Sequence, residues 1–228
     1  MSRSSRLSQV VTLCLPILLL LSSACSLRPI QPSSGGTSQQ AVDGPISDAF
    51  VPNQMGNWSL ERDERAVTEM VNEQLVITVT APNTIQYATL EDRIFSDFVL
   101  EVDTWQRSGS PESSYGVLFR MQDDGQFLRF DITGNGMYII ERHNADGSWT
   151  RLIPDWLPAS AINQGLNELN RLKVIAAGSS LTFYINDVLL AQLIDETFAS
   201  GAIALDAGTF NNGNLQVSFD NLIITPGS

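Results

Sequence analysis

Alternation of apolar and polar residues with a period of two is the feature that most constrains how this chain can fold. In the segment FVLEVDTW, Phe98, Leu100, Val102 and Thr104 would face one side of a strand, and the residues between them the other side. Similar short runs recur to the end of the chain, separated by turns rich in Gly, Asn and Asp. After residue 46 the sequence shows no helical stripe of useful length. Ten or more short strands joined by tight turns predict an all-β fold, an antiparallel β-sandwich.

Residues 1–24 have the composition of a secretory signal peptide. Arg3 and Arg6 precede an apolar run, VVTLCLPILLLL, and small residues lead up to Cys25. The run is shorter than the roughly 20 apolar residues that a membrane-spanning helix needs. The stretch LSSAC resembles the lipobox of bacterial lipoproteins, in which the cysteine becomes the lipidated first residue. We therefore expect an exported protein whose only membrane attachment is lipidated Cys25, with plain secretion as the alternative.

The segment that follows, residues 25–45, is rich in Ser, Gly, Pro and Gln and poor in large apolar residues. Such a composition cannot bury enough surface to fold, so it predicts a flexible linker. We expect the β-sandwich domain to occupy residues 46–228. At about 180 residues, this domain is long enough for one sizeable core.

Composition excludes several classes of function. After the signal peptide the chain carries 25 acidic and 11 basic residues, a net charge of −14, and Lys173 is its only lysine. This balance repels phosphate backbones, so no nucleic-acid binding is expected. Cys14 and Cys25 are the only cysteines, which leaves the domain without a disulfide, a thiol nucleophile or a zinc–thiolate site. His143 is the only histidine, which excludes sites that need two histidine ligands.

Eight segments carry a resemblance that spans residues 48–226: DAF at 48–50, GNW at 56–58, FVLEVDTW at 98–105, YGVLFR at 115–120, NRLKV at 170–174, FYINDVLLA at 183–191, GAIAL at 201–205 and FDNLII at 219–224. Their order resembles the concanavalin A-like jelly roll, in particular its bacterial branch of laminin-G-like and keto-disaccharide-hydrolase-like domains. The resemblance implies two antiparallel sheets packed face to face, with ligands on the outer face of one. Lectins, glucanases and spacer domains share this fold, so the fold alone does not decide the function.

Glu101 and Asp103 are the first candidates for chemistry. By resemblance to the laminarinase-type glucanases of this superfamily, they match the nucleophile and the helper of a motif with acids at three alternate strand positions. The third position falls on Trp105, or on Gln106 if a bulge intervenes. Neither side chain transfers the proton that glycoside hydrolysis requires. We therefore assign no catalytic residue and favour a binding domain, with a glycoside hydrolase of the keto-disaccharide-hydrolase-like kind as the alternative.

Charged and aromatic side chains from several strands would share one sheet face if those strands adjoin. Aromatic rings beside charged hydrogen-bonding groups suit sugars, whose C–H faces stack while their hydroxyls form hydrogen bonds. A network of cross-strand salt bridges is the alternative interpretation. The candidate ligand-binding residues are Glu101, Asp103, Trp105, Arg120, Arg129, Asp131, Tyr138 and Arg142.

Asp48 and Asp220 form a weaker candidate metal site. The first and last strands often pair in this fold, and many lectin-like jelly rolls hold a structural calcium through carboxylate and carbonyl oxygens. No other cofactor is expected. Altogether we expect a lectin-like domain at the cell surface that binds a glycan or another extracytoplasmic partner. A purely structural or adhesion domain is a further alternative, and a buried or paired carboxylate with a raised pKa in the binding face would favour an enzyme.

Overall fold

The computed structural model describes residues 40–41 and 44–227, which form strands and turns without a helix. The expected signal peptide, Cys25 and most of the expected linker lie outside these residues and stay predictions. Within the described ranges, no helical segment has the length and apolar character that crossing a membrane requires.

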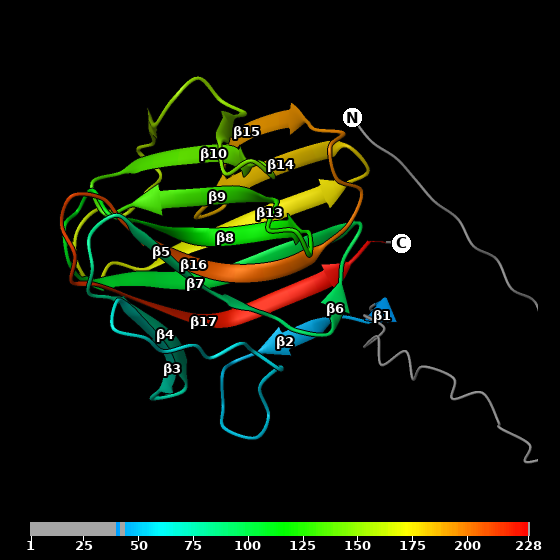
Figure 1. The fold of residues 1–228 in the computed structure, drawn as a ribbon. Helices are drawn as coiled ribbons and strands as arrows, with labels where there is room; N and C mark the ends of the chain where they lie inside the picture. Colours follow the sequence, from blue (N-terminus) through cyan, green and yellow to red (C-terminus); the bar gives the residue numbers. More distant parts are fainter. Residues whose placement is uncertain (1–39, 42–43, 228) are drawn as a thin grey trace, which may run out of the picture. The chain divides into compact units, whose positions relative to one another are not determined.

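Two antiparallel sheets make up the domain (Figure 1). The first sheet has the strand order β11-β10-β9-β8-β16-β5, and β12 also pairs with β10. The bounds of its strands are β5 Thr84–Thr89, β8 Ser114–Met121, β9 Phe127–Thr133, β10 Met137–His143, β11 Trp149–Arg151, β12 Leu157–Pro158 and β16 Ala202–Thr209.

The second sheet has the order β15-β14-β13-β7-β17-β4-β3, and β2 also pairs with β17. A short parallel pair, β1 and β6, completes the strands. The bounds are β1 Gln40–Ala41, β2 Ile46–Asp48, β3 Ala66–Val71, β4 Gln74–Val79, β6 Arg93–Ile94, β7 Phe98–Ser108, β13 Asn170–Ala177, β14 Ser180–Ile185, β15 Val188–Ile194 and β17 Leu215–Pro226.

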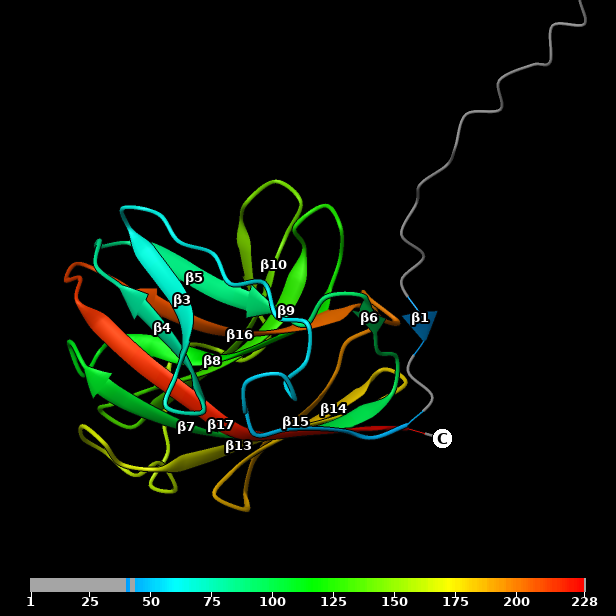
Figure 2. The same ribbon diagram turned by 90° about the horizontal axis from the view of Figure 1, so that it is seen from below.

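The core lies between the sheets, which Figure 2 shows as two layers, with β8, β9 and β16 above β7, β13 and β17. Phe98, Leu100, Val102 and Thr104 are each at most 1% exposed, so the alternation in β7 assigns them to the correct face. Apolar residues that alternate along β8, β9 and β16 meet them from the other layer. The predicted antiparallel β-sandwich is confirmed.

Local turn chemistry shapes the hairpins as the sequence predicts. Asn186 and Asp187 connect β14 to β15, and both have positive φ, 48° and 64°. Two consecutive residues with positive φ make the turn that matches the right-handed twist of paired strands. Asn and Asp tolerate this conformation because their short polar side chains form local hydrogen bonds.

Candidate functional site

A buried charged cluster lies on the outer face of the first sheet. Arg129 and Asp131 alternate along β9 with Leu128, Phe130 and Ile132, which belong to the core between the sheets. The two charged residues therefore point away from that core. Arg129 is only 4% exposed and Asp131 is fully buried, although both lie on the outer face.

Two glycines make room for this cluster. Gly116 on β8 is the partner of Asp131 on one side and of Asp206 on the other. A Cβ added at Gly116 would lie 2.6 Å from Asp131 Oδ1, and one added at Gly208 would lie 3.2 Å from Arg129 Nη2. The absence of side chains at these two positions leaves a trough in the sheet, in which the long Arg129 side chain lies between the carboxylates.

Arg129 contacts three acidic side chains and one hydroxyl. Its Nη1 donates to Glu141 Oε1 at 3.1 Å, and its Nη2 donates to Ser114 Oγ at 2.7 Å and to Asp131 Oδ2. Its Nε lies 3.3 Å from Asp206 Oδ2, within ion-pair distance but without hydrogen-bond geometry. One buried cation thus faces three carboxyl groups.

The charge imbalance is relieved if Asp206 holds a proton. Burial raises the pKa of Asp206 well above its ordinary value, and the negative charge of Asp131 raises it further, whereas Arg129 lowers it. Both oxygens of Asp206 and Oδ1 of Asp131 lack a hydrogen-bond partner among the described residues. A protonated Asp206 could donate a hydrogen bond to Asp131, which would give these carboxyl oxygens a partner. Although burial by itself lowers the pKa of Arg129, the surrounding carboxylates raise it above its ordinary value, so Arg129 stays charged.

Glu141 connects this cluster to a pocket of about 460 Å³. Its side chain is 13% exposed, and burial raises the pKa of its carboxyl group although the neighbouring Arg129 opposes this shift. Trp149 is 39% exposed at the pocket wall, with Arg129 Cζ 5.5 Å from its ring centroid. The pocket is lined by Asn83, Thr84, Ile85, Ser114, Arg129, Glu141, Trp149, Arg151, Trp156, Gly208, Thr209 and Phe210.

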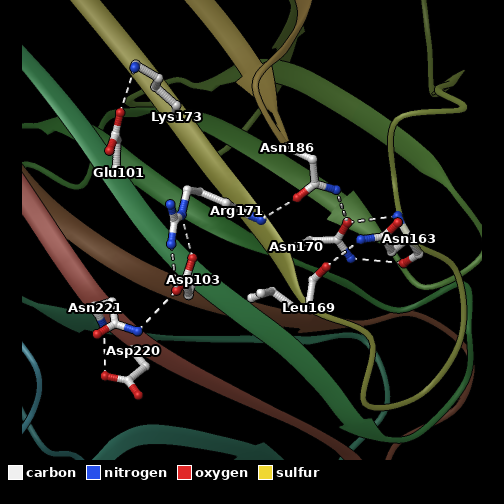
Figure 3. A network of polar contacts seen from close by, with 10 residues as sticks. All are labelled: Glu101, Asp103, Asn163, Leu169, Asn170, Arg171, Lys173, Asn186, Asp220 and Asn221. Carbon is white, nitrogen blue, oxygen red and sulfur yellow. Dashed lines mark hydrogen bonds and ion pairs between the residues drawn. The ribbon is translucent and has the colours of Figure 1, made fainter.

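Glu101 and Asp103 lie elsewhere, on the outer face of the second sheet (Figure 3). The expectation that they share a face with the charged residues of β8, β9 and β10 is wrong, because β7 pairs with β13 and β17. Lys173 Nζ lies 2.6 Å from Glu101 Oε1. Arg171 binds both oxygens of Asp103, at 2.7 and 3.1 Å. These two acids therefore form cross-strand ion pairs.

Of the predicted residues, only Arg129 and Asp131 share the outer face of the first sheet. Trp105 lies on β7 under the Arg107 guanidinium, 4.9 Å from ring centroid to Cζ. Arg120 is buried at a bulge and donates to the carbonyl oxygens of Phe198 and Gly178. Tyr138 and Arg142 lie on the opposite side of β10 from Glu141. Their side chains contact the carbonyl oxygen of Leu190 and the carboxylate of Asp195, respectively.

Asp48 and Asp220 do not fit a calcium site. Their strands pair as expected, with Asp48 opposite Leu222. However, the Asp48 carboxylate accepts hydrogen bonds from Phe50 N, Gly56 N and Trp58 Nε1 at 2.7–2.8 Å. These donors occupy three of the roughly four lone-pair positions of the carboxylate, which is therefore already used within the fold. Among the described residues, no group of three or more His, Cys, Asp or Glu side chains is arranged to hold a metal ion.

Sequence reasoning found Arg129 and Asp131 but missed Glu141, Asp206 and Trp149. β10 carries charged residues on both faces, so its alternation did not show whether Glu141 or Arg142 points outward. For Asp206 a signal was present: it and Gly208 interrupt an otherwise apolar run, AIALDAG. An acidic residue within such an apolar run predicts a buried polar or charged partner, but the sequence does not identify that partner.

Solved structures with the same fold include three carbohydrate-active proteins. The carbohydrate binding module CBM66 from Bacillus subtilis aligns with a TM-score of 0.60 at 16% identity, over 75% of this chain and 96% of its own. The Bacillus licheniformis β-glucanase aligns at 0.60 and 10% identity, over 81% and 99%. The Crh5 transglycosylase in complex with NAG aligns at 0.61 and 11%, over 81% and 84%. At these identities the likeness shows the fold alone, which is the expected concanavalin A-like jelly roll.

Sequence comparison identifies the family. No curated protein sequence matches the chain at a significant level. The family model of the 3-keto-α-glucoside-1,2-lyase-like domain matches residues 42–225. This match covers nearly the whole β-sandwich and agrees with the resemblance to keto-disaccharide-hydrolase-like domains. The chain therefore belongs to the family of 3-keto-α-glucoside-1,2-lyase-like domains.

Proposed function

We propose that this domain binds a glycan in the pocket on the outer face of the first sheet. The observation that carries the proposal is the exposed Trp149 ring beside the polar groups of Glu141, Arg129 and Ser114. An aromatic face packs against the C–H surface of a sugar ring. Charged side chains at the pocket floor form the stronger hydrogen bonds to its hydroxyls.

The structural neighbours support the same substrate class. One is a carbohydrate-binding module, one a β-glucanase and one a transglycosylase solved with NAG. The family description names an α-glucoside. These names concern other proteins, and they motivate a screen in which α-glucosides, β-glucans and N-acetylglucosamine oligomers are all present.

Replacing Trp149 by alanine is expected to weaken glycan binding at least about tenfold, or about 1.4 kcal/mol. The substitution removes the aromatic platform. Because Trp149 also packs against Phe127 and His143, thermal unfolding verifies that the variant is folded. Binding is measured first on a glycan array and then by titration calorimetry of the glycans found, with and without calcium.

Trp105→Ala is the matched control, because Trp105 is the tryptophan that the sequence places in the binding site. It lies on the second sheet, so the pocket proposal expects unchanged binding in this variant. Loss of binding in Trp105→Ala with normal binding in Trp149→Ala would move the site to the second sheet. Absence of any glycan binding would reject the proposal in favour of a structural or adhesion role.

A second candidate function is a carbohydrate-processing enzyme. Glu141 lines the pocket, and burial raises the pKa of its carboxyl group. Burial also raises the pKa of Asp206, which lies beside Arg129. On a 3-keto-α-glucoside, a base would remove the C2 proton, the C–H electrons would form a C1–C2 double bond, and the C1–O bond would break. The leaving oxygen would keep the electrons of that bond and take up a proton, which releases the second sugar. Glu141 is placed to take or donate the proton of such a step.

This second candidate predicts that the protein consumes a 3-keto-α-glucoside and that Glu141→Gln slows the reaction at least about 100-fold. The amide is nearly the same size but cannot exchange the proton. The reaction is followed by chromatography of the released sugar. If the wild type reacts no faster than buffer alone, the proposed enzymatic activity is rejected. If the wild type and Glu141→Gln react at equal rates, the catalytic role of Glu141 is rejected.

We also propose that lipidated Cys25 holds the exported domain at a membrane, since the segment before it has the composition of a lipoprotein signal. In cells that produce the full chain, Cys25→Ser is expected to move the protein from the membrane fraction to the soluble fraction. Labelling with a radioactive fatty acid is expected for the wild type alone. Fatty-acid labelling that persists in the variant would contradict this proposal.

A further inference from the structure

The pocket beside Trp149 and Glu141, in which we propose that a glycan binds, is called the sugar pocket below. The outer sheet face on which it lies continues along strand β5. Ile85, Tyr87 and Thr89 alternate on this strand and point to the outer face, because Gln86 and Ala88 between them point inward. Ile85 lines the sugar pocket, and Tyr87 is the partner of Asp206 in the charged cluster. Ile85 and Tyr87 are 38% and 39% exposed. An apolar and aromatic surface therefore leads away from the pocket.

A second hollow, of about 480 Å³, lies at the far end of this surface. Tyr87 and Thr89 form one side of it. The chain that precedes β3 forms the other side and is attached to β5 by backbone hydrogen bonding, with Ser59 N donating to the carbonyl oxygen of Thr89 at 2.9 Å. The hollow is lined by Ser59, Glu61, Tyr87, Thr89, Leu90, Glu91, Asp92 and Ala202.

The distance between the two hollows exceeds one sugar ring. Ile85 and Thr89 are four residues apart on an extended strand, which corresponds to about 13 Å. Tyr87 lies midway, where an aromatic ring would support the sugar residues between the two ends. A ligand that reaches both hollows must therefore be a chain of sugars.

The charge of the second hollow limits which oligosaccharides can bind there. Glu61, Glu91 and Asp92 line the second hollow, and neither Lys nor Arg is among the residues that line it. The two arginines of the proposed site, Arg129 and Arg151, line the first pocket, at the other end. Asn57 Nδ2 lies 3.4 Å from a Glu91 oxygen and 3.1 Å from an Asp92 oxygen, so a neutral amide is their side-chain hydrogen-bond donor here. Carboxylates repel an anionic sugar and accept hydrogen bonds from hydroxyl or amino groups.

We propose that the sugar pocket, Tyr87 and the second hollow form one elongated site for an uncharged or amino-sugar oligosaccharide, which it holds along β5. The inference rests on the proposed glycan binding and adds the length and the charge of the ligand. It assigns Tyr87 as the residue that distinguishes long chains from short ones.

The test is calorimetric titration of the full chain with oligosaccharides of one to five residues. The probes are α-1,4-gluco-, β-1,3-gluco- and N-acetylchito-oligosaccharides, with oligogalacturonates as the anionic series. In at least one neutral series, affinity is expected to rise at least tenfold between two and four residues. Oligogalacturonates are expected to bind at least tenfold more weakly than that neutral series at every length.

Tyr87→Ala is expected to remove the gain with length while leaving disaccharide binding within about twofold. Tyr87→Phe, which keeps the ring, is expected to restore the gain. Tyr184→Ala, on the second sheet, is the matched control and is expected to behave like the wild type. Thermal unfolding of each variant verifies that it is folded.

The outcomes separate this inference from the proposed function. Binding that Trp149→Ala weakens but that is independent of length or of Tyr87 would overturn the elongated site and leave the pocket standing. Preferred binding of oligogalacturonates would overturn the charge assignment. Absence of binding at every length in all series would overturn both proposals.

Discussion

Replacing Arg129 by methionine is expected to lower the free energy of unfolding by about 3–5 kcal/mol at neutral pH, the usual result of breaking a buried ion pair on one side. Methionine roughly preserves the volume of the side chain but removes the cation. Asp131, which is fully buried, and Glu141 would then be left without the charge that faces them at present. Chemical denaturation at pH 7 measures the effect.

The loss in Arg129→Met should shrink at low pH, because protonated carboxyl groups no longer need a cation. Arg151→Met is the matched control in the same pocket. Arg151 is half-exposed and pairs with Asp155, also exposed, so its replacement is expected to change stability by less than about 1 kcal/mol. A loss below about 1 kcal/mol in Arg129→Met at pH 7 would show that the cluster does not depend on its cation.

Asp206→Asn is expected to change how stability depends on pH. The pKa of Asp206 is raised in the folded chain, mainly by burial, whereas in the unfolded chain it lies near 3.9. As pH rises above about 4, the unfolded chain releases this proton first, so ionisation favours unfolding until the pH reaches the folded pKa. Asparagine has no proton to release, and its amide can donate to Asp131 as a protonated Asp206 would.

The free energy of unfolding of the wild type should therefore fall relative to that of Asp206→Asn as pH rises from about 4. The slope is at most about 1.4 kcal/mol per pH unit for one proton, and it ends at the folded pKa. Urea denaturation of both proteins between pH 4 and pH 8 measures the difference. Added salt should alter it little, since the cluster is buried. Parallel stability curves would show that Asp206 is not protonated in the fold.

The two stability predictions and the proposed functions depend on the same charged cluster around Arg129. A carboxyl group whose pKa is raised well above its ordinary value suits an acid catalyst as well as a hydrogen-bond donor to a sugar. The pH curves establish the protonation of Asp206. The Glu141→Gln experiment then decides whether the protonated cluster supports catalysis or binding alone.

The features that could be predicted from the sequence are local. The period of two in β7 placed Phe98, Leu100 and Val102 in the core, and that of β9 placed Arg129 and Asp131 together on the opposite face. This succeeded because successive side chains of a strand point to opposite sides, whatever its neighbours are. The same pattern, summed over many short strands, determined the sandwich.

Which strands are neighbours in a sheet became known from the folded structure. β7 pairs with β13 and β17, which gives Glu101 and Asp103 basic partners on the second sheet. β16 joins β8, which brings Asp206 across Gly116 to Asp131, about 75 residues away in the sequence. Strand pairing depends on contacts between distant segments, and a side-chain period of two carries no information about them. For this reason the sequence identified Arg129 and Asp131. The pairing of β16 with β8 added Asp206 to the cluster, and the pairing of β10 with β9 added Glu141.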